Sequence, residues 1–119
     1  ACPTGAITEP YVVDATRCIS YLTIEFRGGT DDIPTDLAAG MGNRIFGCDD
    51  CLDVCPFNLR AEPTTEQAFH PLAAALAPRL DELARLDEDA FRERFGRSPV
   101  RRARLAGMRR NVEIARRNE

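Results

Sequence analysis

Five cysteines limit what this chain can fold into more than any other feature. They stand at Cys2, Cys18, Cys48, Cys51 and Cys55, and Cys2 and Cys55 are each followed directly by proline. The chain has 119 residues and no Trp, so few large side chains are available to fill a core. A bound inorganic group would supply the missing stability, as metals do in many small domains.

The spacing of the last three cysteines points to iron–sulfur ligation. Cys48-x2-Cys51-x3-Cys55-Pro matches the second half of C-x2-C-x2-C-x3-C-P, the run that ligates [4Fe–4S] clusters in bacterial two-cluster ferredoxins. In such proteins the cysteine before proline ligates the other cluster. Cys2-Pro3 has the same form, so we interpret Cys2 as the crossover cysteine of an earlier motif.

A count of the ligands then assigns the cysteines. One cluster is predicted to be held by Cys2, Cys18, Cys48 and Cys51. Cys18 takes the place of the first cysteine of the second motif, and an insert of about thirty residues separates it from Cys48, where the motif has two. Cys55 is left for a second cluster. Because the chain opens on Ala1 rather than Met, we expect an upstream portion that carries the other ligands as C-x2-C-x2-C.

Three other interpretations of the cysteines stay open. Disulfides need an extracellular context, and pairing leaves one of the five thiols over. A zinc ion accepts four thiolates in a tetrahedral site, although zinc does not account for two Cys-Pro pairs. The third is a set of buried structural cysteines in an ordinary core. The sequence contains neither a nucleophile paired with a base nor a phosphate-binding glycine loop.

The chain divides into three parts, and its predicted fold class is α+β. Residues 1–60 hold every cysteine, residues 61–77 form a connector, and residues 78–119 read as helical. The longest apolar run, residues 72–77, is far shorter than the roughly 20 residues of a membrane helix, so we expect no membrane span. The predicted elements are a hairpin of 6–7 with 11–13, helices over 15–26, 36–41 and 49–54, and a helix that starts at Ser98-Pro99.

Charge is divided along the chain. Residues 1–60 hold nine acids and four Arg, a net charge of −5, whereas residues 98–119 hold seven Arg and two Glu, a net charge of +5. Such an asymmetry suits a polyanionic partner or merely a solvated helix face. The last helix is expected to bury a stripe of Leu105, Met108, Val112 and Ala115, with Ile114 outside it. Arg102, Arg109, Arg110 and Arg117 are expected to lie off the stripe, with Arg101 and Arg104 nearer to it.

Several stretches of the chain resemble one enzyme family, the epoxyqueuosine reductases. They are Ala1-Cys-Pro-Thr-Gly-Ala-Ile, Arg17-Cys-Ile-Ser-Tyr-Leu-Thr-Ile-Glu, Gly42-Asn-Arg-Ile-Phe-Gly-Cys-Asp-Asp-Cys and Val54-Cys-Pro-Phe-Asn. The resemblance includes the insert between Cys18 and Cys48. Ser98-Pro-Val-Arg-Arg and Arg109-Arg-Asn resemble, more loosely, that family's C-terminal HEAT-like segment.

The resemblance implies a C-terminal fragment of a cytoplasmic enzyme with cobalamin and two [4Fe–4S] clusters. The fragment would be a ferredoxin-like domain, truncated at its N-terminus, followed by a HEAT-like helical segment. The enzyme reduces epoxyqueuosine to queuosine at the tRNA wobble position, so the implied partners are tRNA and an electron donor such as a ferredoxin or flavodoxin. Because the family's catalytic Asp and most of its cobalamin pocket belong to a domain that this chain lacks, we assign no catalytic residue and expect the fragment alone to be inactive.

Carried over residue by residue, the resemblance gives the same cluster ligands and adds two further sets of residues. Four positions are implied to face the cobalamin: Ser20, Cys48, Asp49 and Asp50. Three are implied to face the tRNA: Ser98, Arg101 and Arg102. The alternative function is a ferredoxin-like electron-transfer domain of another oxidoreductase, such as a cobalamin enzyme of the reductive dehalogenase type.

Overall fold

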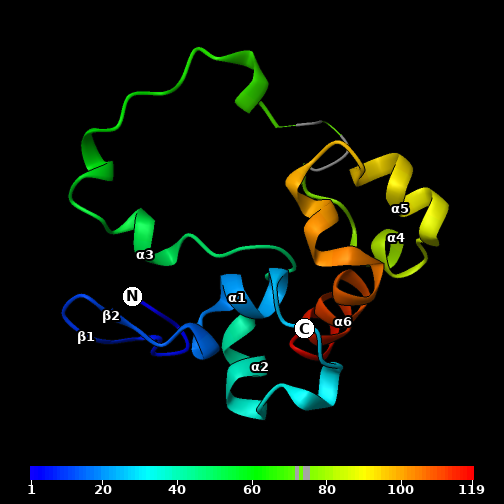
Figure 1. The fold of residues 1–119 in the computed structure, drawn as a ribbon, viewed down its shortest axis with the longest axis horizontal. Helices are drawn as coiled ribbons and strands as arrows, with labels where there is room; N and C mark the ends of the chain where they lie inside the picture. Colours follow the sequence, from blue (N-terminus) through cyan, green and yellow to red (C-terminus); the bar gives the residue numbers. More distant parts are fainter. Residues whose placement is uncertain (72, 74–75) are drawn as a thin grey trace.

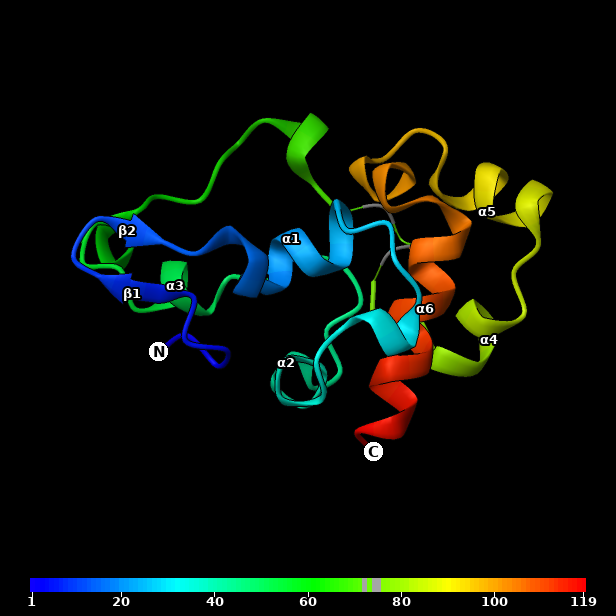
Figure 2. The same cartoon turned by 60° about the horizontal axis from the view of Figure 1, so that its bottom comes forward.

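The fold is mostly helical, with one small sheet (Figures 1 and 2). The computed structural model describes residues 1–71, 73 and 76–119, so part of the predicted connector, and of the apolar run 72–77, lies outside the described residues. In both views α6 (Arg104–Arg117) stands between α1 and α2 on one side and α4 and α5 on the other. No helix in the described part of the chain is long and apolar enough to cross a membrane.

The predicted hairpin is confirmed. β1 (Ile7–Glu9) and β2 (Val12–Val13) pair antiparallel, with Ile7 opposite Val13 and Glu9 opposite Val12. Tyr11 makes the turn with a positive φ of 67°. Pro10 stands in the turn between the strands, where its missing N–H costs no ladder hydrogen bond.

The prediction of one helix over residues 15–26 is wrong, because the chain breaks at Cys18. Asp14 accepts a hydrogen bond from the Thr16 backbone N–H at 3.0 Å and starts a short 3-10 turn, η1 (Ala15–Arg17). Cys18 is extended, with φ of −73° and ψ of 124°, and α1 (Ile19–Ile24) begins directly after it. A residue in the extended region cannot continue a helical hydrogen-bond series, so Cys18 separates the two elements.

The first core packs α1 against α2. The predicted helices over 36–41 and 49–54 are confirmed to within one residue as α2 (Thr35–Met41) and α3 (Asp50–Asp53). The 3-10 turn η2 (Thr30–Asp32) precedes α2, and the 3-10 turns η3 (Asn58–Arg60) and η4 (Gln67–Phe69) follow α3. The buried members of this core are Ile19, Leu22, Ile33, Leu37, Met41 and Ile114.

The second core lies among the helices of the last forty residues, which are α4 (Leu80–Ala84), α5 (Glu88–Phe95), η6 (Pro99–Ala103) and α6. The predicted start at Ser98-Pro99 is confirmed as a 3-10 turn. The Ser98 hydroxyl does not cap it and instead donates backward to the Phe95 carbonyl at 3.1 Å. The buried members of this core are Leu83, Phe91, Phe95, Leu105, Met108 and Val112.

Two expectations for α6 are wrong. Ile114, expected outside the apolar stripe, is 2% exposed and packs in the first core. Arg110, expected on the outer surface, is 5% exposed. The reason is that α6 packs on two sides, against α4 with one face and against α1 and α2 with another. A single apolar stripe predicts only one buried face.

Arg110 and Asn111 connect α6 to the end of α1. The Arg110 guanidinium donates to the carbonyls of Leu22, Phe26 and Gly28 at 2.6, 2.7 and 3.0 Å, and it also lies 5.2 Å from the centre of the Phe26 ring. The Asn111 amide donates to the carbonyls of Thr23 and Ile45 at 2.8 and 2.9 Å. The Leu22 and Thr23 carbonyls belong to the last turn of α1, where a helix leaves acceptors unpaired, and those of Phe26 and Gly28 lie just after it.

Replacing Asn111 with Ala is expected to lower the free energy of unfolding by about 1–3 kcal/mol, because buried carbonyls lose their donor where water cannot replace it. Urea denaturation would measure the loss. Asn118→Ala is the matched control, since the exposed Asn118 also donates to two carbonyls, those of Ala38 and Gly42. Equal losses in the two variants would contradict the role of burial.

Candidate iron–sulfur centre

Four of the five cysteines line one cavity of about 90 Å³: Cys2, Cys18, Cys48 and Cys51. They come from the N-terminal segment, the residue before α1, the loop before α3 and α3 itself. Cys55, the residue assigned to another cluster, does not line this cavity. The structure thus brings together the four residues that the spacing grouped as one ligand set, although 46 positions separate the numbers of Cys2 and Cys48.

The donor set fits a cluster better than a single ion. In the part of the chain that the structure describes, no three His, Cys, Asp or Glu side chains are close enough to hold one metal ion. A zinc site needs its thiolates within about 2.3 Å of one atom, whereas a cluster carries each thiolate on a different iron. Pro3, Ala6, Ile7, Val13 and Ile19 also line the cavity, together with Asp50, so the surroundings of the sulfurs are largely apolar.

Two hydroxyls on one face of α1 position Cys48. The Ser20 Oγ accepts from the Cys48 backbone N–H at 3.0 Å and donates to the Cys48 carbonyl at 3.3 Å. One turn further along, the fully buried Thr23 Oγ accepts from the Gly47 N–H at 2.9 Å. Since Cys18 immediately precedes α1, these bonds place Cys48 beside Cys18 at the far end of the insert.

Ser20 and Asp49, two of the residues predicted to face the cobalamin, differ in their exposure and in their hydrogen bonds. The Ser20 hydroxyl is half-buried and already bonded to Cys48, so its visible contacts are to the protein backbone. Asp49 is exposed and precedes α3 without a side-chain cap hydrogen bond. Neither observation tests cobalamin contact, and the assignment stays a prediction.

Asp50 lies beside the Cys48 sulfur and is paired with Arg44. The Cys48 thiol donates to Asp50 Oδ1 at 3.4 Å, and Arg44 Nη2 lies 2.8 Å from both Asp50 oxygens. Burial raises the pKa of the Cys48 thiol, and the Asp50 side chain and its charge add to the rise. The hydrogen bond with Arg44 lowers the pKa of Asp50 and raises that of Arg44.

The environment of Cys2 has the opposite effect. Burial alone would raise the pKa of this thiol, but a hydrogen bond with the Thr4 side chain and hydrogen bonds from the N–H groups of Ala6, Thr4 and Ile7 outweigh it, giving a pKa of about 7. The Ala6 N–H lies 3.2 Å from the sulfur. Cys2 therefore ionises more readily than an ordinary cysteine even without a metal, and a thiolate is the form that binds iron.

An arginine-rich surface surrounds η6. A shallow pocket of about 470 Å³ is lined by Arg27, Pro99, Arg101, Arg102 and Arg104, and we call its four arginines the η6 arginine surface. Ser98 and Arg97 line the neighbouring pocket. The sequence assigned Arg101 and Arg102 but missed Arg27, because Arg27 comes from the cysteine-bearing half and reaches the surface only in the fold.

The arginines of this surface differ in their partners. Arg102 pairs with Glu25, and Arg27 donates to the Arg102 carbonyl at 3.2 Å. Among the described residues, the exposed side chains of Arg101 and Arg104 have no hydrogen-bond or ion-pair partner. Those two guanidinium groups have the greatest freedom to bind an anion.

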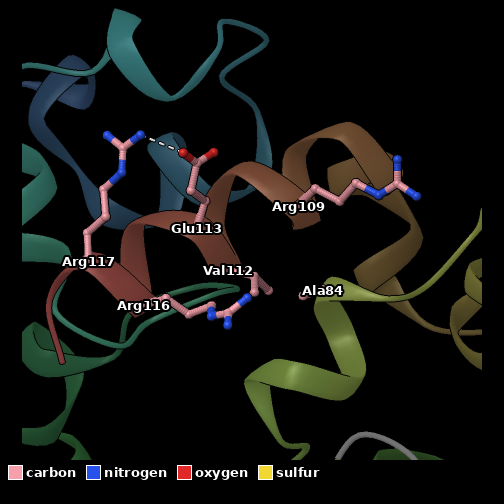
Figure 3. A pocket seen from close by; sticks show the side chains of 6 residues that line it. All are labelled: Ala84, Arg109, Val112, Glu113, Arg116 and Arg117. Carbon is pink, nitrogen blue, oxygen red and sulfur yellow. Dashed lines mark hydrogen bonds and ion pairs between the residues drawn. The ribbon is translucent and has the colours of Figure 1, made fainter.

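In a second arginine-lined pocket, on α6, two of the three arginines are paired with acids. Figure 3 shows Arg109, Arg116 and Arg117 around Val112 and Ala84, and we call this the α6 groove. Arg117 pairs with Glu113, as the dashed line marks, and Arg116 lies 3.5 Å from Asp81. Arg109 donates to the Leu86 carbonyl at 2.7 Å. This groove is therefore less suited to an anion than the η6 arginine surface.

In protein without clusters, alkylation of Cys2 by iodoacetamide is expected to reach half its maximal rate near pH 7, because the pKa of this thiol is about 7 and the thiolate is the nucleophile. Cys48, whose pKa is raised, is expected to require a higher pH. Mass spectrometry of each modified peptide would measure both profiles. In urea the two profiles should merge near the ordinary cysteine pKa of about 8.5. Identical profiles for the two cysteines in the folded protein would contradict this prediction.

Comparison with known proteins gives one consistent result. Residues 1–58 match a family described as a 4Fe-4S double cluster binding domain. The chain is 49% identical over 114 residues to the epoxyqueuosine reductase of Escherichia coli (strain K12), covering 96% of this chain and 29% of that protein. It is 40% identical to that of Cellulophaga algicola, of which it covers 36%.

The structural comparison agrees with the sequence comparison. A crystal structure of epoxyqueuosine reductase with an epoxyqueuosine-modified tRNA-Tyr stem loop superposes with a TM-score of 0.88 at 32% identity, over 99% of this chain and 30% of that one. A structure of the Bacillus subtilis enzyme gives the same TM-score. The chain spans about a third of the length of these relatives or less. Over nearly its whole length, this segment is similar in sequence and in fold to one part of the epoxyqueuosine reductases.

Proposed function

We propose that this chain is the electron-transfer and tRNA-docking portion of an epoxyqueuosine reductase, which reduces epoxyqueuosine to queuosine at the tRNA wobble position. The observation that carries the proposal is the cavity lined by Cys2, Cys18, Cys48 and Cys51. All the relatives described above are epoxyqueuosine reductases, which favours this function over that of an electron-transfer domain in another oxidoreductase.

The residues around the cavity have three tasks in electron transfer. When bound, a [4Fe–4S] cluster accepts and releases one electron at a time. The four thiolates hold it, the Ser20 and Thr23 hydroxyls fix the backbone at Cys48, and the apolar lining limits access of water. Cys55 is assigned to the second cluster of the double-cluster domain. A small donor such as a ferredoxin or flavodoxin would supply the electrons.

Cobalamin, which the family uses, would be bound mainly by residues outside this segment. We keep Ser20, Cys48, Asp49 and Asp50 as the positions proposed to face it. The geometry gives these positions unequal support: Asp49 is exposed, whereas Asp50 is paired with Arg44 and Ser20 is bonded to Cys48. The assignment of a cytoplasmic location follows from the proposed action on tRNA.

The η6 arginine surface is the proposed tRNA-docking site, within a helical segment of HEAT-like type. Ser98, Arg101 and Arg102 are the positions assigned from the sequence, and we include Arg27 and Arg104 because they line the same pocket as Arg101 and Arg102. Phosphate contacts by Arg supply most of the sequence-independent affinity for nucleic acids. A related epoxyqueuosine reductase has been crystallised with a tRNA stem loop, which supports RNA as the polyanion.

Replacing Cys18 with Ser is expected to halve the iron and sulfide of the anaerobically purified holoprotein, from about eight to about four of each, because one of two [4Fe–4S] clusters loses a ligand. Cys55→Ser should remove the other cluster, and EPR after dithionite reduction should show a different remaining signal. Leu59→Ser, which introduces the same residue at an exposed position, should retain both clusters. Stoichiometric zinc without sulfide in the unmodified protein would refute the electron-transfer function.

Replacing Arg101 and Arg104 with Ala is expected to weaken tRNA binding and to reduce the slope of log affinity against log salt by about 1 for each phosphate that the variant no longer neutralises. Filter binding at several salt concentrations would measure the slope. Arg116→Ala is the matched control, since that arginine is paired with Asp81 in the α6 groove. If Arg116→Ala weakened binding as much as the double variant, the docking surface would be wrongly placed.

A further inference from the structure

An ion pair lies next to one predicted cluster ligand, and neither the spacing of the cysteines nor the proposed electron path assigns it a role. Arg44 holds Asp50 through three hydrogen bonds, from Nε at 3.2 Å and from Nη2 at 2.8 Å to each carboxylate oxygen. Arg44 Nη1 also donates to the Met41 carbonyl at 3.3 Å, which fixes the guanidinium at the end of α2. Such a bidentate pair has a defined geometry.

The pair is placed where a charge can act on the cluster. Asp50 lines the same cavity as Cys2, Cys18, Cys48 and Cys51, and its Oδ1 is 3.4 Å from the Cys48 sulfur. The side chains of Arg44 and Asp50 are 32% and 27% exposed, so solvent screens them less than the arginines at the protein surface.

Cluster ligation changes what Asp50 faces. In the free protein the Cys48 thiol donates its proton to Asp50. As a ligand, Cys48 is a thiolate and has no proton to donate, so a carboxylate would lie beside a negatively charged sulfur. Arg44 supplies the positive charge that offsets this carboxylate at the same position.

We propose that Arg44 neutralises the charge of Asp50 beside the cluster held by Cys48, and so keeps that carboxylate from lowering the reduction potential of the cluster. The proposal rests on the cluster assignment made above. Reduction adds a negative charge to the cluster, so a nearby carboxylate disfavours it and a nearby guanidinium favours it. Paired, the two groups nearly cancel, and Asp50 can remain at the cavity without lowering the potential.

Charge variants give shifts of opposite sign. In the anaerobically purified holoprotein, Arg44→Gln should move the midpoint potential of one cluster to more negative values, because the Asp50 carboxylate is left unopposed. Asp50→Asn should move it to more positive values, because the Arg44 charge is left unopposed. The double variant should return close to the unmodified protein. Redox titration followed by EPR measures each potential without reference to catalysis.

Two further variants separate charge from structure. Arg44→Lys keeps the charge but loses the bidentate fork, so the potential should stay near that of the unmodified protein. Arg92→Gln removes an exposed arginine paired with Asp89 on α5 and should move neither potential. A purely structural role would lower the iron content of the variants without opposite shifts in the retained cluster.

The outcomes distinguish this proposal from the cluster assignment. Unchanged potentials in both Arg44→Gln and Asp50→Asn, with iron retained, would refute the neutralising role of Arg44 alone. If the Arg44→Gln variant loses its cluster, the Asp50→Asn variant provides the test. A midpoint potential of Asp50→Asn that is not more positive than that of the unmodified protein would refute the proposal. Retention of about eight irons after Cys48→Ser would instead refute the ligand assignment on which both rest.

Discussion

The buried contact between Arg110 and the end of α1 is the interaction on which the rest of this structure depends. α1 has only six residues, and a helix so short is not stable by itself. Arg110 and Asn111 satisfy carbonyls at its end, while Ser20 and Thr23 on its surface hold the backbone of Gly47 and Cys48. The frame of the cluster site is therefore completed by α6, from the other end of the chain.

Burying a guanidinium is costly unless its donors are used, and here they are. Arg110 donates to three backbone carbonyls and to the Asn111 side chain, and burial lowers its pKa. None of these partners carries a full negative charge. The contact therefore adds no buried carboxylate to residues 1–60, which are already acidic. Because Arg110 holds α6 against α1, Ile114 of α6 packs in the same core as residues of α1 and α2.

The grouping of Cys2, Cys18, Cys48 and Cys51 could be predicted from the sequence, because their spacing matches a known ligand pattern, and the structure places those four around one cavity. Their ligation of one cluster stays a prediction. The break at Cys18 could not be predicted, since Asp14 and the apolar residues after it are equally typical of one continuous helix. The second buried face of α6 was also missed: a stripe at helical spacing marks one face, and Ile114 and Arg110 depend on a partner distant in sequence.

The arginines show most clearly what composition leaves undetermined, because all sixteen basic residues of the chain are Arg. Arg110 is buried on carbonyls and holds the fold, Arg44 is half-buried against a carboxylate beside the cavity, and Arg101 is exposed on η6. A planar guanidinium suits all three environments, as a carbonyl donor, a bidentate partner and a phosphate ligand. The neighbours of each side chain, set by the fold, decide which of these it becomes. A basic stretch near a chain's end therefore indicates an anion-binding surface only after its buried and paired arginines have been set aside.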